Sequence, residues 1–103
     1  MTRRPFFRRA ARLEYDETVT WYEAHREGLG REFVAEIDRA VARACEAPLQ
    51  FPIMLRDVRR VVVARFPYSV FFRVKPARLV VLSVFHARRD PLVWREQSSP
   101  ERS

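Results

Sequence analysis

The second half of the chain carries three apolar stretches: RRVVVARF at residues 59–66, YSVFFRV at residues 68–74 and LVVLSVF at residues 79–85. Valine, phenylalanine and tyrosine dominate them, and these residue types are enriched in β-strands. Only Pro67 separates the first two stretches, and a short loop at residues 75–78 separates the last two. Connections this short join neighbouring antiparallel strands, so the sequence predicts a three-stranded meander.

Two helices are predicted in the first half, after a short strand at residues 5–8. Apolar residues recur there at helical spacing and define one inward face for each helix. The first face, in a helix that starts at Arg9, comprises Ala11, Tyr15, Thr18, Val19 and Tyr22, and the second comprises Phe33, Ile37, Ala40, Val41 and Ala44. Charged residues, Glu36 among them, fall largely on the opposite face. The glycines at 28 and 30 are expected to end the first helix, and Pro48 to end the second.

These elements predict an α+β fold with the order β-α-α-β-β-β. The two helices should form a hairpin packed on one face of an antiparallel sheet, because neither apolar helix face can be buried alone. Asp90 and Pro91 predict a short C-terminal helical turn with Asp90 as its N-cap. We expect a single domain at residues 1–96 and a disordered tail at residues 97–103.

Composition excludes several classes of protein. No run approaches the roughly 18 consecutive apolar residues of a membrane span, and the N-terminus does not have the pattern of a secretory signal. Cys45 is the only cysteine, which excludes an internal disulfide and a cysteine-based zinc site. The chain has only 2 glycines, too few for a glycine-rich phosphate loop. We therefore expect a cytoplasmic protein with no metal, no cofactor and no membrane contact.

The charge is distributed unevenly. The chain has 20 basic and 13 acidic residues, a formal charge of +7, and the basic residues are all arginine except Lys75. Residues 1–51 are neutral overall, so the whole excess lies in residues 52–103. An asymmetry of this kind is typical of a surface that binds phosphate or an acidic partner, although an arginine-rich composition alone produces a similar count.

Strand periodicity predicts where these arginines point. In the stretch 59–66, Arg59 and Arg65 share one face and Arg60 lies on the other. In the next stretch Val70 and Phe72 are the better core residues, which leaves Arg73 on the uncovered face. One of the two arginine sets should join Arg73 there, and Arg88 and Arg89 should extend its rim. The sequence thus predicts an arginine-lined sheet face.

The chain resembles the RelE/ParE superfamily of toxins from type II toxin–antitoxin systems. Three fragments carry the resemblance in order: WYEAHREGLGREF at residues 21–33, VRRVVVARFPYSVFFRV at 58–74 and VVLSVFHARRDPLVW at 80–94. The resemblance implies a helical hairpin on an antiparallel sheet. It also implies growth inhibition by the toxin, an acidic antitoxin that wraps it, and contact with operator DNA only through that antitoxin.

The superfamily has two activities. ParE-like members inhibit DNA gyrase, and the VFHARRD segment and the WYE…GLG…F hairpin are closer to this branch. RelE-like members cut messenger RNA on the ribosome without a metal, and here Arg60, His86 and Arg89 are the candidate catalytic residues. Val62 and Ser69 stand where that branch has cations, so its set is incomplete. A degenerate toxin that only binds antitoxin is the third alternative.

The resemblance and the arginine pattern together give the remaining site predictions. Target or phosphate binding is assigned to Arg59, Arg65, Arg73, Arg88 and Trp94, and antitoxin binding to Trp21, Tyr22 and Tyr68. Each assignment has a structural alternative. Arg65 and Arg73 can instead neutralise acids such as Asp57, Tyr68 can pack beneath the helices, and His86 can bond only to backbone at a strand end.

Overall fold

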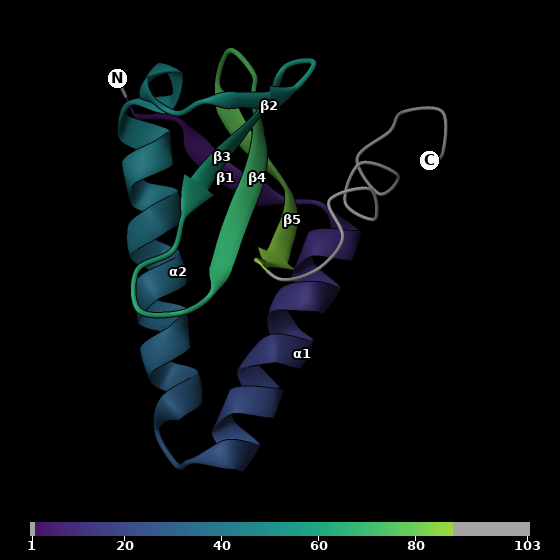
Figure 1. The fold of residues 1–103 in the computed structure, drawn as a ribbon. Helices are drawn as coiled ribbons and strands as arrows, with labels where there is room; N and C mark the ends of the chain where they lie inside the picture. The colour runs from purple at the N-terminus through teal and green to yellow at the C-terminus, as the bar shows by residue number, and fades with distance from the viewer. Residues whose placement is uncertain (1, 88–103) are drawn as a thin grey trace.

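The computed structural model describes residues 2–87, and Figure 1 shows two helices on one side of a five-stranded sheet. The elements are β1 (Arg4–Phe7), α1 (Arg9–His25), α2 (Leu29–Glu46), the 3-10 turn η1 (Pro48–Gln50), β2 (Ile53–Leu55), β3 (Val58–Val62), β4 (Tyr68–Val74) and β5 (Arg78–His86). The α+β fold is confirmed. The predicted turn at Asp90, the end of the predicted domain and the tail at 97–103 lie outside the described residues.

The predicted antiparallel meander is confirmed as β3, β4 and β5, but the sheet as a whole is mixed and not antiparallel throughout. Its strand order is β1-β5-β4-β3-β2, and β1 runs parallel to β5, with Arg4 beside Arg78 and Phe7 beside Val81. The other pairs are antiparallel. Residues 79–85 are buried or nearly so on both faces of the sheet. Pairing with β1 keeps this most apolar strand off the edge of the sheet, where its backbone groups would be exposed.

Two further strand predictions need correction. The short edge strand β2 follows Pro52 and was not predicted, because three residues carry too little periodicity to be recognised. β3 ends at Val62 rather than at residue 66. The segment after it bends back: the Val63 N–H donates to the Tyr68 carbonyl, and Arg65 has a φ of 70°, which is outside the β region.

Both predicted helix faces are confirmed. Phe33, Ile37, Ala40 and Ala44 of α2 are fully buried, and they pack with strand residues such as Phe72 in the main core. On α1, Ala11 is fully buried and Tyr15, Val19 and Tyr22 pack against the same core. Glu36 was expected on the solvated side of α2, but it is only 6% exposed. Its carboxylate remains buried because cations surround it, as described below.

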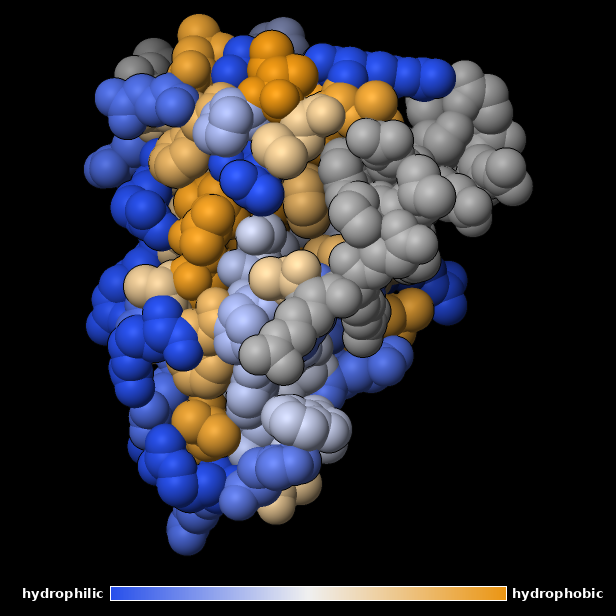
Figure 2. Space-filling model, viewed as in Figure 1, coloured by the Kyte–Doolittle hydropathy of each residue, from blue (hydrophilic) through white to orange (hydrophobic). Residues whose placement is uncertain are grey.

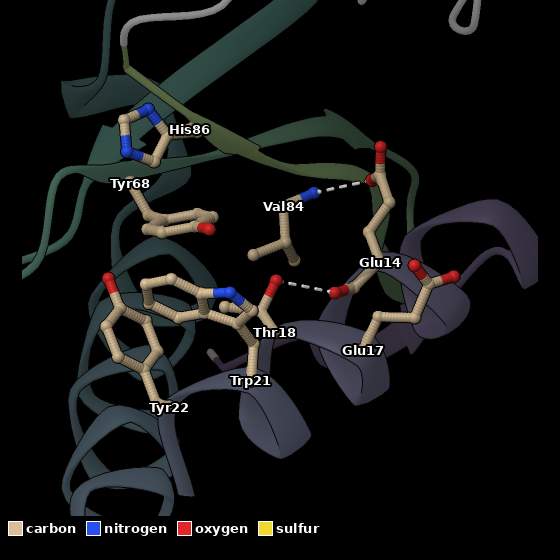
Figure 3. A pocket seen from close by; sticks show the side chains of 8 residues that line it. All are labelled: Glu14, Glu17, Thr18, Trp21, Tyr22, Tyr68, Val84 and His86. Atoms are coloured by element: carbon tan, nitrogen blue, oxygen red, sulfur yellow. Dashed lines mark hydrogen bonds between the residues drawn. The ribbon is translucent and has the colours of Figure 1, made fainter. Parts of the chain in front are cut away.

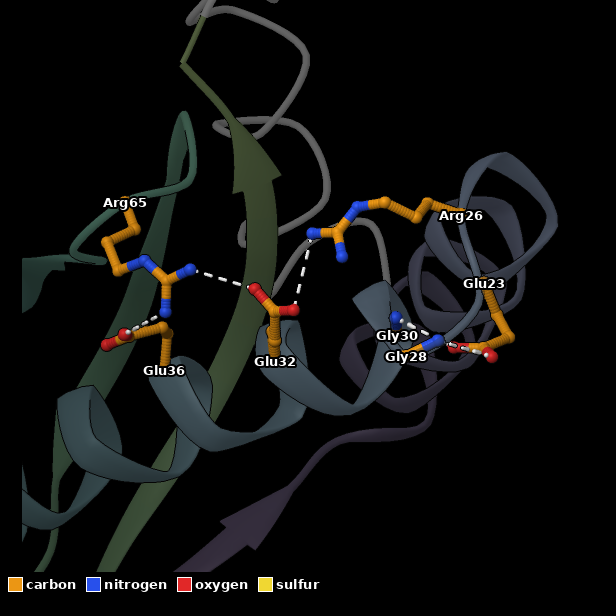
Figure 4. Close-up of polar contacts among 7 residues, drawn as sticks. All are labelled: Glu23, Arg26, Gly28, Gly30, Glu32, Glu36 and Arg65. Carbon is orange, nitrogen blue, oxygen red and sulfur yellow. Dashed lines mark hydrogen bonds and ion pairs between the residues drawn. The ribbon is translucent and has the colours of Figure 1, made fainter.

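The glycines in the hairpin begin the second helix instead of ending the first. α1 already ends at His25, and Gly28 takes a left-handed φ of 88° just before α2. The Glu23 carboxylate accepts hydrogen bonds from the Gly28 and Gly30 N–H groups, both at 2.9 Å (Figure 4). Glu23 therefore caps the N-terminus of α2, where a negative charge is favoured.

A second apolar cluster lies on the sheet face away from the helices. Val58, Phe71, Leu82 and Phe85 form it, with Leu55 and Val80 at its margin. A bulge shifts the β4–β5 register between Phe71 and Phe72, where Leu82 of β5 has no paired residue on β4. On the helix side of the bulge, Glu14 Oε1 accepts hydrogen bonds from Ser83 Oγ and the Val84 N–H, both at 3.0 Å.

Candidate functional site

The sheet face that the helices leave uncovered carries two of the predicted arginines. Arg60 is paired with Phe71 and Arg73 with Val58, so both arginines emerge beside the second apolar cluster. Arg73 Nε lies 3.0 Å from Asp57 Oδ1, which anchors this guanidinium at the edge of the face. We predicted that arginines from one face of the stretch 59–66 would join Arg73 on the uncovered sheet face. The structure shows that this is the face that contains Arg60.

Arg59 and Arg65, which were assigned to target or phosphate binding together with Arg73, do not lie on that face. Arg59 is on the helix side, where its Nη1 donates to the Phe51 carbonyl at 2.7 Å. Arg65 reaches helix α2, with Nη2 2.8 Å from Glu32 and Nη1 3.4 Å from Glu36 (Figure 4). The left-handed turn at Arg65 directs its side chain to these carboxylates instead of along the strand.

Both acids of this ion-pair cluster, Glu32 and Glu36, belong to α2. Arg39 Nη1 lies 3.1 Å from Glu36, so that buried carboxylate has two cationic partners. The hydrogen bond from Arg65, assisted by Arg26, lowers the pKa of Glu32 below its ordinary value. The same contacts raise the pKa of Arg65. Arg65 is therefore engaged in holding the β3–β4 loop to the helix.

Positive charge gathers elsewhere on the uncovered face, around a groove that the sequence did not predict and that we call the cationic groove. Four cationic side chains line a cavity of about 340 Å³ together with three apolar ones: Arg8, Arg73, Lys75 and Arg78 with Phe6, Val80 and Leu82. The Arg78 guanidinium lies 5.1 Å from the centre of the Phe6 ring. Only the parallel pairing of β1 with β5 brings these residues together, and that pairing has no local sequence signal.

Apolar and charged residues lie side by side on the surface of the molecule (Figure 2). Figure 2 shows a band of hydrophobic residues that runs between hydrophilic ones. Several large apolar side chains remain exposed in the structure, among them Phe6 at 48% and Val62 at 57%. Exposed apolar groups rimmed by charge are typical of an interaction surface.

The three residues assigned to antitoxin binding share a second cavity, between α1 and the ends of β4 and β5. Trp21, Tyr22 and Tyr68 line it with His86, and its volume is about 350 Å³ (Figure 3). We call it the aromatic recess. Its other lining residues are Glu14, Glu17, Thr18 and Val84.

The rings of the aromatic recess contact one another at nearly right angles. The ring centres of Trp21 and Tyr22 are 5.1 Å apart, and those of Tyr68 and His86 are also 5.1 Å apart. Burial raises the pKa of Tyr22, and the neighbouring Tyr68 raises it further. Trp21 remains 55% exposed, so it presents a large aromatic surface to a partner.

The candidate nuclease residues are not assembled into one site. Arg60 lies on the uncovered face, whereas His86 lines the aromatic recess on the helix side of the sheet. The sheet thus separates a candidate phosphate-binding cation from the candidate acid or base. Arg89, Arg88 and Trp94 lie outside the described residues. Within residues 2–87, no group of three or more His, Cys, Asp or Glu side chains could hold a metal ion.

Neither helix in the described part of the chain is long and apolar enough to cross a membrane. No curated protein matches the chain. A solved structure described as a chromosomal ParDE TA system from P. aeruginosa is similar in fold, with a TM-score of 0.71. It is 22% identical, and the match covers 84% of this chain and 98% of that chain.

A family model described as the ParE toxin of the type II toxin–antitoxin system parDE matches residues 6–91. The match covers both helices, strands β2 to β5 and the last two residues of β1. The chain therefore belongs to the ParE toxin family of type II toxin–antitoxin systems.

Proposed function

We propose that this chain is a growth-inhibiting toxin of the cytoplasm that acts on DNA gyrase and is neutralised by an acidic antitoxin. Membership of the ParE family supports this proposal, because gyrase inhibition is the role of that family. The single structural observation that carries it is the uncovered sheet face. There Arg60 and Arg73 stand beside exposed and buried apolar side chains, a combination that suits binding to a protein surface.

The aromatic recess is the proposed docking site for the antitoxin. Trp21, Tyr22 and Tyr68 come from two elements far apart in the sequence and present ring edges and faces to the same cavity. Tryptophan and tyrosine supply much of the binding energy at protein interfaces, because they bury a large area at low entropic cost. An antitoxin side chain that fills the recess would therefore anchor the complex.

The geometry gives less support to ribosome-dependent cleavage of messenger RNA. That reaction needs a base and phosphate-binding cations around one scissile bond. Arg60 and His86 project to opposite sides of the sheet, so they do not meet around a common substrate. The proposal therefore assigns no hydrolytic chemistry to this chain.

The test combines two assays. DNA gyrase is assayed for supercoiling of relaxed plasmid with increasing amounts of the chain, and a translating extract is assayed for new 5′ ends on its messages. The proposal predicts loss of supercoiling or trapped cleavage complexes, and no new 5′ ends. Message cleavage with normal supercoiling would show that the target is the ribosome and not gyrase. No effect in either assay, and no growth arrest on expression without antitoxin, would indicate a degenerate toxin.

A further inference from the structure

The aromatic recess contains two kinds of group that attract a cation. Figure 3 shows aromatic rings at one end of it and acidic side chains at the other, from Trp21, Tyr22 and Tyr68 and from Glu14 and Glu17. The face of an aromatic ring carries negative potential and attracts a cation, most strongly in tryptophan. A carboxylate attracts the same cation through its full charge. A positively charged group in the recess can therefore contact both kinds.

The charge of the recess is opposite to the charge of the chain. The chain has a formal charge of +7, yet no arginine or lysine among residues 2–87 lines this cavity. The Glu14 carboxylate is fixed at its margin by the hydrogen bonds from Ser83 and Val84. Charges farther away on the surface are largely screened beyond about 8 Å at physiological ionic strength. The nearby carboxylates therefore dominate the field that a cation meets in the recess.

The two groups nearest the solvent, Trp21 and Glu17, are open to a ligand. Glu17 is exposed and forms no ion pair with any residue of the described range 2–87. Trp21 is 55% exposed, although the His25 ring packs on it with 3.7 Å between ring centres. The His25 ring thus holds the indole in place without covering it. Trp21 follows Glu17 by four residues on α1, so the two side chains are neighbours on one helix face.

The size and chemistry of the recess favour one guanidinium group. Its volume of about 350 Å³ is near the lower end of the range of small-ligand pockets, roughly 300–1,000 Å³. A guanidinium is planar, so its face stacks on an aromatic ring while its edge donates hydrogen bonds to a carboxylate. It is also more weakly hydrated than an ammonium group, so it loses less on leaving water.

We propose that the aromatic recess binds an arginine side chain of a partner protein, with the guanidinium stacked on Trp21 and donating to the Glu17 carboxylate. The identification of this partner as the antitoxin rests on the proposed function. The antitoxin is expected to be acidic overall, so this arginine would be a reversed charge in its interface. Only one register of the partner brings that charge to the recess, so the recess sets the register and the choice of partner.

An arginine side chain suits the recess better than a nucleotide does. A nucleobase can also stack on tryptophan and tyrosine rings. Its phosphate, however, needs cations nearby, and the charged lining residues among residues 2–87 are the acids Glu14 and Glu17. Like charges would therefore oppose the binding of a nucleotide.

The first test uses two blocked amino acids, N-acetylarginine amide and N-acetylcitrulline amide. Citrulline has nearly the shape of arginine but carries no charge. Heteronuclear NMR titrations follow the backbone amides of α1 in the full chain and in two matched pairs of variants: Glu17→Gln with Glu27→Gln, and Trp21→Ala with Leu13→Ala. All four positions are exposed, and neither Glu27 nor Leu13 lines the recess. Thermal melts check that the variants fold.

We expect blocked arginine to bind the full chain at least fivefold more tightly than blocked citrulline. Its affinity should fall at least threefold in Glu17→Gln and at least fivefold in Trp21→Ala, but less than twofold in Glu27→Gln and Leu13→Ala. Equal binding of arginine and citrulline would overturn the proposal, and so would equal losses within either pair of variants. Tighter binding of tetramethylammonium or of adenosine monophosphate than of blocked arginine would assign the recess to another ligand and overturn it as well.

The second test identifies the protein that carries the arginine. Each arginine of the antitoxin is replaced in turn by glutamine, and calorimetry measures binding to the full chain and to its Trp21→Ala variant. One replacement should weaken binding to the full chain at least tenfold but binding to the variant less than threefold, because residues in contact are not additive. If every replacement has the same effect on both proteins, the antitoxin does not place an arginine in the recess and the proposal is wrong.

The outcome is separable from that of the proposed function. A chain that inhibits gyrase but binds blocked citrulline as tightly as blocked arginine overturns this inference alone. One that prefers blocked arginine without affecting gyrase overturns the proposed target alone.

Discussion

The guanidinium of Arg65 lies 2.8 Å from the carboxylate of Glu32 and connects the β3–β4 loop to helix α2 (Figure 4). Its second nitrogen lies 3.4 Å from Glu36, whose side chain is only 8% exposed. A carboxylate that is withdrawn from water needs a cationic partner to remain charged. Arg65 and Arg39 supply that partner for Glu36, and Arg65 also holds the loop that leads into β4.

The first prediction concerns acid stability. The Arg65 hydrogen bond lowers the pKa of Glu32 from its ordinary value of 4.5, so the charged form of Glu32 favours the folded state. This stabilisation is present above pH 4.5 and is lost as the pH falls through the lowered pKa. Replacement of Arg65 by alanine should lower the melting temperature at pH 7 and reduce its dependence on pH in the acid range. Melting temperatures between pH 7 and pH 3 measure both effects.

Arg9→Ala is the matched control for that variant, because Arg9 is exposed at the start of α1. Its acid profile should follow that of the unaltered chain. An R65A profile with the same slope as the control would contradict the assigned role of the ion pair.

The second prediction concerns the contact between the two helices. A Cβ added at Gly30 would lie 2.9 Å from the backbone carbonyl oxygen of Val19 and 2.9 Å from Glu23 Oε1. Because the Val19 oxygen is backbone, α1 and α2 must separate to accept Gly30→Ala. We expect a loss of about 1–3 kcal/mol in the free energy of unfolding, measured by urea titration.

Removal of the Glu23 side chain should not restore the stability of this variant. The double variant Gly30→Ala with Glu23→Ala keeps the clash with the Val19 carbonyl and also loses the cap of α2. Recovery of stability in the double variant would show that the flexible carboxylate, and not the backbone, limits the space at Gly30.

The third prediction concerns the aromatic core. Phe33 is fully buried, and its ring centre lies 5.2 Å from that of Phe66 and 5.3 Å from that of Tyr68. Phe33→Ala should cost about 3–5 kcal/mol of unfolding free energy, since it leaves a cavity among these rings. Phe6→Ala removes a ring that is 48% exposed and should cost less than half as much. Similar losses in the two variants would contradict the assignment of Phe33 to the core.

The fourth prediction concerns the aromatic recess. Trp21→Ala removes the most exposed of its aromatic rings and should weaken antitoxin binding at least tenfold, as measured by calorimetry. Leu13→Ala is the control, because Leu13 is similarly exposed at 52% on α1 and does not line the recess. Equal affinities of the two variants for the antitoxin would place its docking site elsewhere.

The sequence predicts the parts of this fold that depend on local periodicity. Both helix faces, from Ala11 to Tyr22 and from Phe33 to Ala44, are recognisable because each follows one helical repeat. Trp21 and Tyr68 were assigned to one binding function from the family resemblance, and the structure brings them to one cavity. Their docking role itself awaits the experiment above.

The parts that were missed depend on contacts between distant residues. Arg65 leaves the predicted strand face because its backbone turns left-handed and two acids of α2 attract its side chain. Arg8 and Arg78 line one groove because β1 pairs with β5, which is more than 70 residues away in the sequence. Register, bulges and long-range strand pairing have no signal in local spacing, so the cationic groove is visible only in the structure.

The most direct test of the account is supercoiling by purified DNA gyrase in the presence of three proteins: the unaltered chain, its Lys75→Glu/Arg78→Glu variant and its Arg9→Glu/Arg31→Glu variant. The account predicts that the unaltered chain and the Arg9→Glu/Arg31→Glu variant inhibit gyrase at similar concentrations. The Lys75→Glu/Arg78→Glu variant, which reverses two charges on the uncovered sheet face, should need a concentration at least tenfold higher. Inhibition by all three proteins at the same concentration would contradict a working role for the uncovered sheet face. Full supercoiling in excess of the unaltered chain would contradict gyrase as the target.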